Sequence, residues 1–410
     1  MCRVAMMSVH GCPLARFGSK EAGGMQVYIR ELSRAMGRRS MVVDVYTRLT
    51  DPRLPEVVEF GENVRVIHVK AGEVGPMDKN EVFDRLPEFI CNVRHFADDH
   101  GLKYQYVHSH YWLSGWVGSL LSRRWNVPHT ATFHTLARVK NRALLGPSET
   151  EHRAEVEAKI IAGADAIVVS SEHERHALLD LYGARRDRIH VIPPGIDLGL
   201  FRPVNRGRAK AELGLDGRDV VLAVGRMDPV KGFDVLLRAV ALLPQLDSVQ
   251  LVLIGGAEGD REHERLRSLA SSLGLDGRAA FVEPVPQQQL PLYYGAASLV
   301  VVPSHYESFG FVAAEALACG TPVIASKVGG LPTIVHDGEN GLLVPWRRPE
   351  AFAERIAWLL ADREMLGRLA CGARASVERL SWASAAERTI CLYRQLGEAR
   401  TPEPVCCCGS

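Results

Sequence analysis

Two glutamates in the second half of the chain stand at a spacing that suits the binding of a polyhydroxy ligand. Glu307 and Glu315 form an E-x7-E arrangement within SHYESFGFVAAEALACGTPVIAS (304–326). A carboxylate accepts hydrogen bonds from two neighbouring hydroxyl groups, which matches the vicinal diol of a ribose or a hexose. The loop and first helical turn expected between them expose backbone N–H groups suited to a sugar or phosphate. Those groups belong to Ser308, Phe309, Gly310 and Phe311.

Two cations occur in GRMDPVKGFDVLL (225–237). Arg226 ends an apolar strand pattern and Lys231 opens the next helical pattern. In a parallel sheet this places both at the carboxyl edge, where ligands bind. Such cations offset the charge that develops on a departing diphosphate. The alternative is a pair of solvated surface charges.

Glycines and histidines follow strand patterns of the first half. In GSKEAGGMQVYIREL (18–32), Gly23 and Gly24 precede a helix, whose first N–H groups favour phosphate. Because this is not a full G-x-G-x-x-G, a plain strand-to-helix turn is an equal alternative. His110 and Tyr111 end one strand, and His134 and Thr135 end another. A lone histidine is more often structural, but four polar groups at neighbouring strand ends indicate an acceptor site.

Short apolar runs alternate with amphipathic stretches, which predicts parallel α/β layers. Strands are expected at 3–9, 42–47, 64–69, 106–110, 129–134, 166–171, 220–225, 249–255, 279–284, 299–304, 322–326 and 341–345. Helices are expected at 24–37, 80–98, 113–124, 151–163, 173–182, 231–243, 261–273, 310–319, 349–361 and 381–396. We expect four segments: an acceptor-binding domain over 1–197, a nucleotide-sugar domain over 198–380, a helix over 381–398 that crosses back to the first domain, and a disordered tail over 399–410.

The overall charge argues against a polyanionic partner. The net charge is +1, from 49 basic and 48 acidic residues, so neither nucleic acid nor an anionic membrane is an expected partner. No apolar stretch approaches the roughly 18 residues of a membrane span, and the N-terminus lacks the marks of a signal peptide. We therefore expect a cytoplasmic protein. The nine cysteines contain no C-x-x-C pair, so most are expected to be buried. The sequence indicates no role for the trio at 406–408.

In combination, the strings at 23–32, 225–232 and 304–326 resemble family 4 of the retaining glycosyltransferases. The resemblance runs from residue 3 to about residue 396. It implies the GT-B fold, two Rossmann-like doubly wound α/β domains facing across a cleft. It also implies transfer of a hexosyl group from a UDP-sugar with retained anomeric configuration, by a front-face path in which the leaving phosphate helps to deprotonate the acceptor hydroxyl.

EAGGMQVYI (21–29), HSHYWLSGWVG (108–118) and HTLARVKN (134–141) are similar to strings of family members that act in mycothiol biosynthesis. Those members imply N-acetylglucosamine transfer from UDP-N-acetylglucosamine to 1D-myo-inositol 3-phosphate. By motif match the catalytic residues are Arg226, Lys231, Glu307 and His134. The expected donor contacts are Gly24, Arg226, Lys231, Glu307, Ser308, Phe309, Gly310, Phe311 and Glu315. The expected acceptor contacts are His10, Gly23, Met25, Gln26, Lys79, Tyr111, Thr135 and Arg153.

Two departures leave the substrates open. Gln26 stands where the inositol enzymes carry asparagine, and sucrose-phosphate synthases carry glutamine there. Glucose transfer from UDP-glucose to fructose 6-phosphate is therefore an alternative. Val285 replaces an arginine near the uracil, which weakens the uridine assignment.

Further alternatives concern the class of protein. A non-catalytic sugar-nucleotide-binding protein is less consistent with the retained cations and glutamates. An NAD-dependent oxidoreductase would need a full G-x-G-x-x-G with an acidic residue further on. No D-x-D motif follows a strand, so no obligatory cofactor is expected, while accessory Mg²⁺ and a homodimer remain open. The expected partners are a nucleotide-sugar donor and a phosphorylated small-molecule acceptor.

Overall fold

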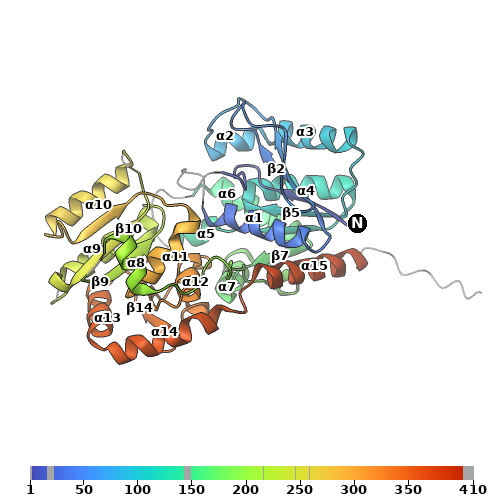
Figure 1. The fold of residues 1–410 in the computed structure, drawn as a ribbon. Coiled ribbons are helices and arrows are strands. Elements are labelled where there is room, and N and C mark those ends of the chain that lie inside the picture. The colour runs from blue at the N-terminus through green and yellow to red at the C-terminus, as the bar shows by residue number, and fades with distance from the viewer. Residues whose placement is uncertain are drawn as a thin grey trace, which may run out of the picture.

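The computed structural model of the chain describes residues 2–15, 23–142, 149–215, 217–244, 246–257 and 259–399. Figure 1 shows two α/β units, the blue-to-green first unit beside the green-to-red second unit, with helix α15 running back along the first. Apart from residue 399, the tail expected at 399–410 lies outside the described residues, as does the cysteine trio.

The first unit is an eight-stranded sheet in the order β3-β4-β2-β1-β5-β6-β7-β8. All neighbours are parallel except β3 and β4, which are antiparallel. The strands are β1 (Arg3–Met7), β2 (Val42–Arg48), β3 (Val57–Gly61), β4 (Val64–Val69), β5 (Tyr106–His110), β6 (His129–Thr132), β7 (Ala166–Val169) and β8 (Ile189–Val191). The helices are α1 (Gly24–Gly37), α2 (Lys79–Asp84), α3 (Leu86–Asp99), α4 (Tyr111–Trp125), α5 (Ala137–Arg142), α6 (Glu151–Gly163) and α7 (Glu172–Tyr182).

The second unit is a six-stranded parallel sheet in the order β11-β10-β9-β12-β13-β14. Its strands are β9 (Asp219–Val224), β10 (Val249–Ile254), β11 (Ala279–Val282), β12 (Leu299–Val302), β13 (Val323–Ser326) and β14 (Gly341–Val344). Its helices are α8 (Arg206–Leu213), α9 (Phe233–Ala241), α10 (Arg261–Ser272), α11 (Leu290–Ala296), α12 (Phe311–Ala318), α13 (Pro349–Ala361) and α14 (Arg363–Val377).

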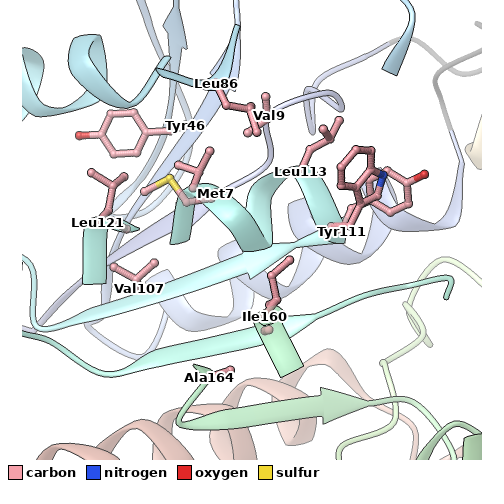
Figure 2. Packing of buried hydrophobic residues seen from close by; sticks show 14 of the residues in the cluster. Met7, Val9, Tyr46, Leu86, Val107, Tyr111, Leu113, Leu121, Ile160 and Ala164 are labelled. Atoms are coloured by element: carbon pink, nitrogen blue, oxygen red, sulfur yellow. The ribbon is translucent and has the colours of Figure 1, made fainter. Parts of the chain in front are cut away.

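Both faces of each sheet are covered, which explains why the central strands read as continuous apolar runs. Val4 and Met6 of β1 face one hydrophobic cluster, and Ala5 and Met7 face another. Figure 2 shows part of the latter cluster, where Met7 packs near Leu113 and Leu121 of α4. The alternation fixes which face of the sheet each strand residue points to.

The chain connects the two units twice. The first connection follows β8, and the second follows α14 and leads into α15 (Trp382–Glu398). The connections touch, because the Ile196 N–H donates to the Leu380 carbonyl at 2.8 Å and Ile196 pairs with Ser381 in a parallel bridge. α15 then packs on α1, and Tyr393 joins its hydroxyl to Nδ1 of His108 at 2.6 Å.

Some sequence-based expectations differ from the structure. The helix expected at 80–98 is two helices, because the chain turns at Arg85 before Pro87 in the first turn of α3. The short edge strands β3 and β8 were not expected, nor were the helices α5, α8, α11 and α14. The expectation that most cysteines are buried is wrong: of the six described, only Cys319 is buried, and Cys2, Cys91, Cys371 and Cys391 are exposed. No helix within the described ranges is long and apolar enough to span a membrane.

Candidate active site between the two units

A cavity of about 910 Å³ lies between the units and is lined by residues of both. It brings together the predicted site residues from the strand ends of the two sheets. His110, Gly310 and Glu315 are the exceptions and do not line it. The predicted residues that do are His10, Gly23, Gly24, Met25, Gln26, Lys79, Tyr111, His134, Thr135, Arg153, Arg226, Lys231, Glu307, Ser308, Phe309 and Phe311.

Lys231 and Glu307 form an ion pair in this cavity. The Lys231 Nζ lies 2.6 Å from Oε2 of Glu307, and the side chains are 24% and 18% exposed. Lys231 ends a 3-10 turn after β9, and the side chain of Asp228 caps that turn. Gly329 packs closely against the Glu307 backbone, because a Cβ at residue 329 would lie 1.9 Å from the Glu307 carbonyl oxygen. The predicted sugar-binding carboxylate is therefore oriented by the predicted diphosphate-binding lysine.

Arg226 supplies the less compensated cation of the donor side. Its side chain is 55% exposed, and its nearest carboxylate, Asp228, is 4.0 Å away. Its Nε lies 4.0 Å from the position that a Cβ would take at Gly23. Arg226 thus reaches from the second unit to the start of α1 in the first.

The N-termini of α1 and α12 meet at the same place. A Cβ at Gly24 would lie 3.3 Å from the ring of Phe311, so glycine permits this approach. Neither helix has an acidic residue in its first turn. The first N–H groups of a helix carry partial positive charge and bind anions. With Arg226 and Lys231 beside them, these helix ends form an electropositive wall suited to a diphosphate.

The Gln26 side chain makes a hydrogen bond within its own helix that the sequence analysis did not anticipate. Its Oε1 accepts a hydrogen bond from the Gly23 N–H at 3.0 Å and so caps α1. Its amide also packs against Gly11, where a Cβ would lie 2.8 Å from Nε2. Although Gln26 lines the cavity, its side chain folds back on its own helix instead of extending across the acceptor space.

Glu315 is buried within α12 and accepts a hydrogen bond from the Tyr294 hydroxyl at 2.8 Å. Burial raises the pKa of Glu315 to about 7. Its other partner is Gln287, which in turn accepts a hydrogen bond from Nη2 of Arg30 at 3.1 Å across the two units. The predicted ribose contact is therefore set back from the cavity in this structure.

His134 lines the cavity and has a left-handed backbone conformation, with φ of 61°. Its Nε2 bonds Nδ1 of His110 at 3.1 Å. Burial lowers the pKa of His134 to about 3, so its imidazole is neutral near pH 7. The His134 carbonyl accepts a hydrogen bond from Oγ of Ser308 at 2.6 Å, and Oγ of Ser170 donates to the Ser308 carbonyl at 3.0 Å. These two bonds tie the Glu307 loop to the first unit.

The predicted acceptor residues gather around Tyr111. The Lys79 Nζ lies 5.3 Å from the Tyr111 ring centre and the Arg153 guanidinium 4.7 Å. Nη2 of Arg153 donates to both the carbonyl and Oγ1 of Thr135, at 2.9 and 3.2 Å. Arg153 is not an ordinary surface charge, because it is only 2% exposed and bonds Glu157 through Nε at 2.8 Å. This end of the cavity therefore gathers the cations Lys79 and Arg153 around one aromatic ring.

Several lining residues were not singled out from the sequence. Lys140 and Glu149 belong to the acceptor end, and Ser170 and Glu174 to the contact between the units. Lys140 lies within HTLARVKN (134–141), a string that the sequence analysis already compared with family members, so this string could have identified it as a site residue. Among the residues that the structure describes, no group of three histidine, cysteine or acidic side chains is arranged to hold a metal ion.

The arrangement suits a particular kind of ligand pair. The cavity is lined by Arg226 and Lys231 on one side, by Lys79, Lys140 and Arg153 on another, and by the neutral His134. Two carboxylates lie on the donor side of the cavity: Glu307, which Lys231 neutralises, and Asp228, which lies 4.0 Å from Arg226. The site is therefore organised to bind and stabilise charge.

Comparisons with known proteins agree with this geometry. Residues 22–200 match the model of Glycosyltransferase Family 4, and residues 205–376 match that of Glycosyl transferases group 1. The chain is 44% identical to the D-inositol 3-phosphate glycosyltransferase of Xylanimonas cellulosilytica, over 97% of this chain and 98% of that protein. It is likewise 44% identical to the Acidothermus cellulolyticus protein of that name, over 97% and 92%.

Two solved structures are also similar. Sucrose-phosphate synthase from Thermosynechococcus elongatus has a TM-score of 0.90 and 38% identity, covering 97% of this chain and 100% of that one. Anabaena HepE, in complex with UDP and glucose, has a TM-score of 0.78 and 20% identity, covering 96% and 100%, and shares the fold.

Proposed function

Because the chain belongs to glycosyltransferase family 4 and has the GT-B fold, we propose that it transfers a hexosyl group from a UDP-sugar to a phosphorylated small acceptor, with retention. We propose N-acetylglucosamine as the sugar and 1D-myo-inositol 3-phosphate as the acceptor. The names of the relatives at 44% identity support the acceptor. In this scheme residues 1–197 bind the acceptor and residues 198–380 the donor.

The observation that carries the proposal is one cavity with two anion-binding ends. The donor diphosphate lies against Arg226, Lys231 and the N-termini of α1 and α12. As the bond between the anomeric carbon and the phosphate oxygen breaks, these groups stabilise the charge left on UDP. The acceptor oxygen bonds the anomeric carbon on the same face, and its proton passes to the departing phosphate.

No protein nucleophile is required in this reaction. Glu307 is held by Lys231 at 2.6 Å, which makes its carboxylate a poor nucleophile and a good acceptor for sugar hydroxyls. His134 is neutral at working pH, so its role is hydrogen bonding beside the donor sugar. Closing the cleft around both substrates excludes the water that would otherwise hydrolyse the donor.

A second candidate is glucose transfer from UDP-glucose to fructose 6-phosphate. Two observations favour it: Gln26 stands in the glycine loop, and the sucrose-phosphate synthase structure is similar at 38% identity. The two candidates share the donor wall and the need for an acceptor phosphate. They differ in the sugar ring that Gln26 and its neighbours must accommodate.

The test is a matrix of donors and acceptors read by UDP release. UDP-N-acetylglucosamine and UDP-glucose are each combined with inositol 3-phosphate, fructose 6-phosphate and the two unphosphorylated acceptors. The proposal expects the highest kcat/KM for the first donor with inositol 3-phosphate, and EDTA should not abolish it. Lys79→Met should raise KM for phosphorylated acceptors alone. Equal turnover of the unphosphorylated acceptors would refute the proposed acceptor class.

A further inference from the structure

The anion-binding end of the cavity already contains a carboxylate. Glu149 lines the cavity with its side chain 21% exposed. Its Oε2 lies 2.8 Å from Nη1 of Arg153, and its Oε1 accepts a short hydrogen bond from Nζ of Lys140. The carboxylate therefore lies between two cations at the place where an acceptor phosphate is expected.

The backbone of Glu149 is fixed independently of these ion pairs. Its N–H donates to Oδ1 of Asn141 at 2.7 Å, and its carbonyl accepts from Nδ2 of Asn141 at 3.1 Å. The next residue, Thr150, is the N-cap of α6. The helix N-terminus adds positive potential at this point. The position thus favours an anion for three reasons: Lys140, Arg153 and the start of α6.

The remaining charges leave room for a second anion. Glu157 is fully buried and accepts hydrogen bonds from Arg153, the Ala137 N–H and the Tyr182 hydroxyl, so it is a fixed partner. The described ion pairs of this cluster are made by Lys140 and Arg153, whereas the Lys79 Nζ lies over the Tyr111 ring. Burial of the Lys79 ammonium group is the main cause that lowers its pKa, and the positive charges of Arg153 and Lys140 lower it further. The cluster as a whole therefore remains short of negative charge.

On the basis of the phosphorylated acceptor proposed above, we propose that Glu149 is an exchangeable counter-ion, which the acceptor phosphate replaces on Lys140 and Arg153. Lys140 is then a further acceptor-binding residue, and Glu149 lowers the affinity for the phosphate. A phosphate carries between one and two negative charges and three acceptor oxygens, so it binds Lys79 in addition to the two cations that Glu149 holds. That surplus drives the exchange.

The exchange is tested with inorganic phosphate as the probe, by isothermal titration calorimetry on the full chain without donor. Glu149→Gln removes the competing charge and should tighten phosphate binding by about fivefold or more, the effect of one unit charge at close range. Glu151→Gln is the matched control: it removes the same charge two residues away, on a side chain that is 74% exposed and lies outside the cavity. It should leave phosphate affinity unchanged. Unchanged or weaker phosphate binding by Glu149→Gln would overturn the inference.

Lys140→Met provides a second measurement that does not depend on the folding of the Glu149 variant. It should weaken phosphate binding, since the lysine holds the phosphate once exchange has occurred. Unchanged binding would place the probe elsewhere and reject the exchange.

Turnover separates this inference from the proposed function. In Glu149→Gln, KM should fall for phosphorylated acceptors and stay the same for unphosphorylated ones. If phosphate binding responds as expected but no phosphorylated acceptor is a substrate, the proposed function fails and the exchange stands. If inositol 3-phosphate is a substrate but phosphate binding does not respond, the exchange alone fails.

Discussion

Replacing Lys231 by methionine tests the donor side of the site most directly. Methionine keeps an unbranched apolar stem and removes the charge that lies 2.6 Å from Glu307. Loss of one preorganised group that stabilises a developing charge costs about 10²- to 10³-fold in rate, or about 3–4 kcal/mol. The ion pair is partly exposed, so its loss should cost only about 1 kcal/mol of the free energy of unfolding.

The test is decisive because the expected loss of rate is much larger than the expected loss of stability. Initial rates of UDP release at saturating acceptor give kcat and donor KM, and thermal unfolding gives the stability. A large loss of rate with a small loss of stability identifies Lys231 as a donor-binding residue. Lys159→Met is the control, because that lysine is exposed on α6 and outside the cavity.

Pairing Lys231→Met with Glu307→Gln adds a double-mutant cycle. If the two groups bind different parts of the donor, the double variant should be slower than either single one. If they only neutralise each other, the double variant should recover activity. Lys231→Met that folds and retains rates within about threefold of the unchanged protein would refute the donor-site assignment.

Three further outcomes are expected. Burial raises the pKa of Glu315 to about 7, above its unfolded value of about 4.5, so the folded state binds this proton more tightly than the unfolded state. The stability that this protonation contributes, about 3 kcal/mol, is therefore lost as pH rises from about 4.5 through 7. Measurements of the free energy of unfolding against pH should show this loss, and Glu315→Gln should abolish it. Ser308→Ala removes the hydrogen bond to the His134 carbonyl and should raise donor KM while costing about 1 kcal/mol in unfolding; unchanged donor KM would argue against a role in positioning. Gly329→Ala places a Cβ 1.9 Å from the Glu307 carbonyl at φ of 54° and should lower the free energy of unfolding by more than about 1 kcal/mol, as thermal denaturation would show.

The sequence predicted those parts of the site that depend on local pattern. Arg226 and Lys231 follow a strand pattern, and the carboxyl ends of parallel strands share one edge, so their presence in the cavity could be expected. The same reasoning placed His134 and Tyr111. The GT-B fold followed from the alternation of strands and helices together with the resemblance of the motifs, and the similar solved structures confirm it.

Features that depend on long-range contacts could not be predicted. Glu149 precedes the N-cap of α6, so its place beside Arg153 also depends on the backbone hydrogen bonds that Asn141 makes with it. The Gln26 side chain can either cap its own helix or extend into the cavity, and the pattern GGMQ does not indicate which of the two conformations it adopts. The Arg153–Glu157 pair is the exception, since an i, i+4 spacing on one helix predicts such a contact.

The doubled connection between the units restricts how the cleft opens. Ile196 and Leu380 belong to the two separate crossings and are joined by a hydrogen bond, so the two crossings are attached to each other. Any rotation of one unit against the other therefore bends both crossings at this one place. The end of the second crossing is fixed to the first unit, because α15 packs on α1.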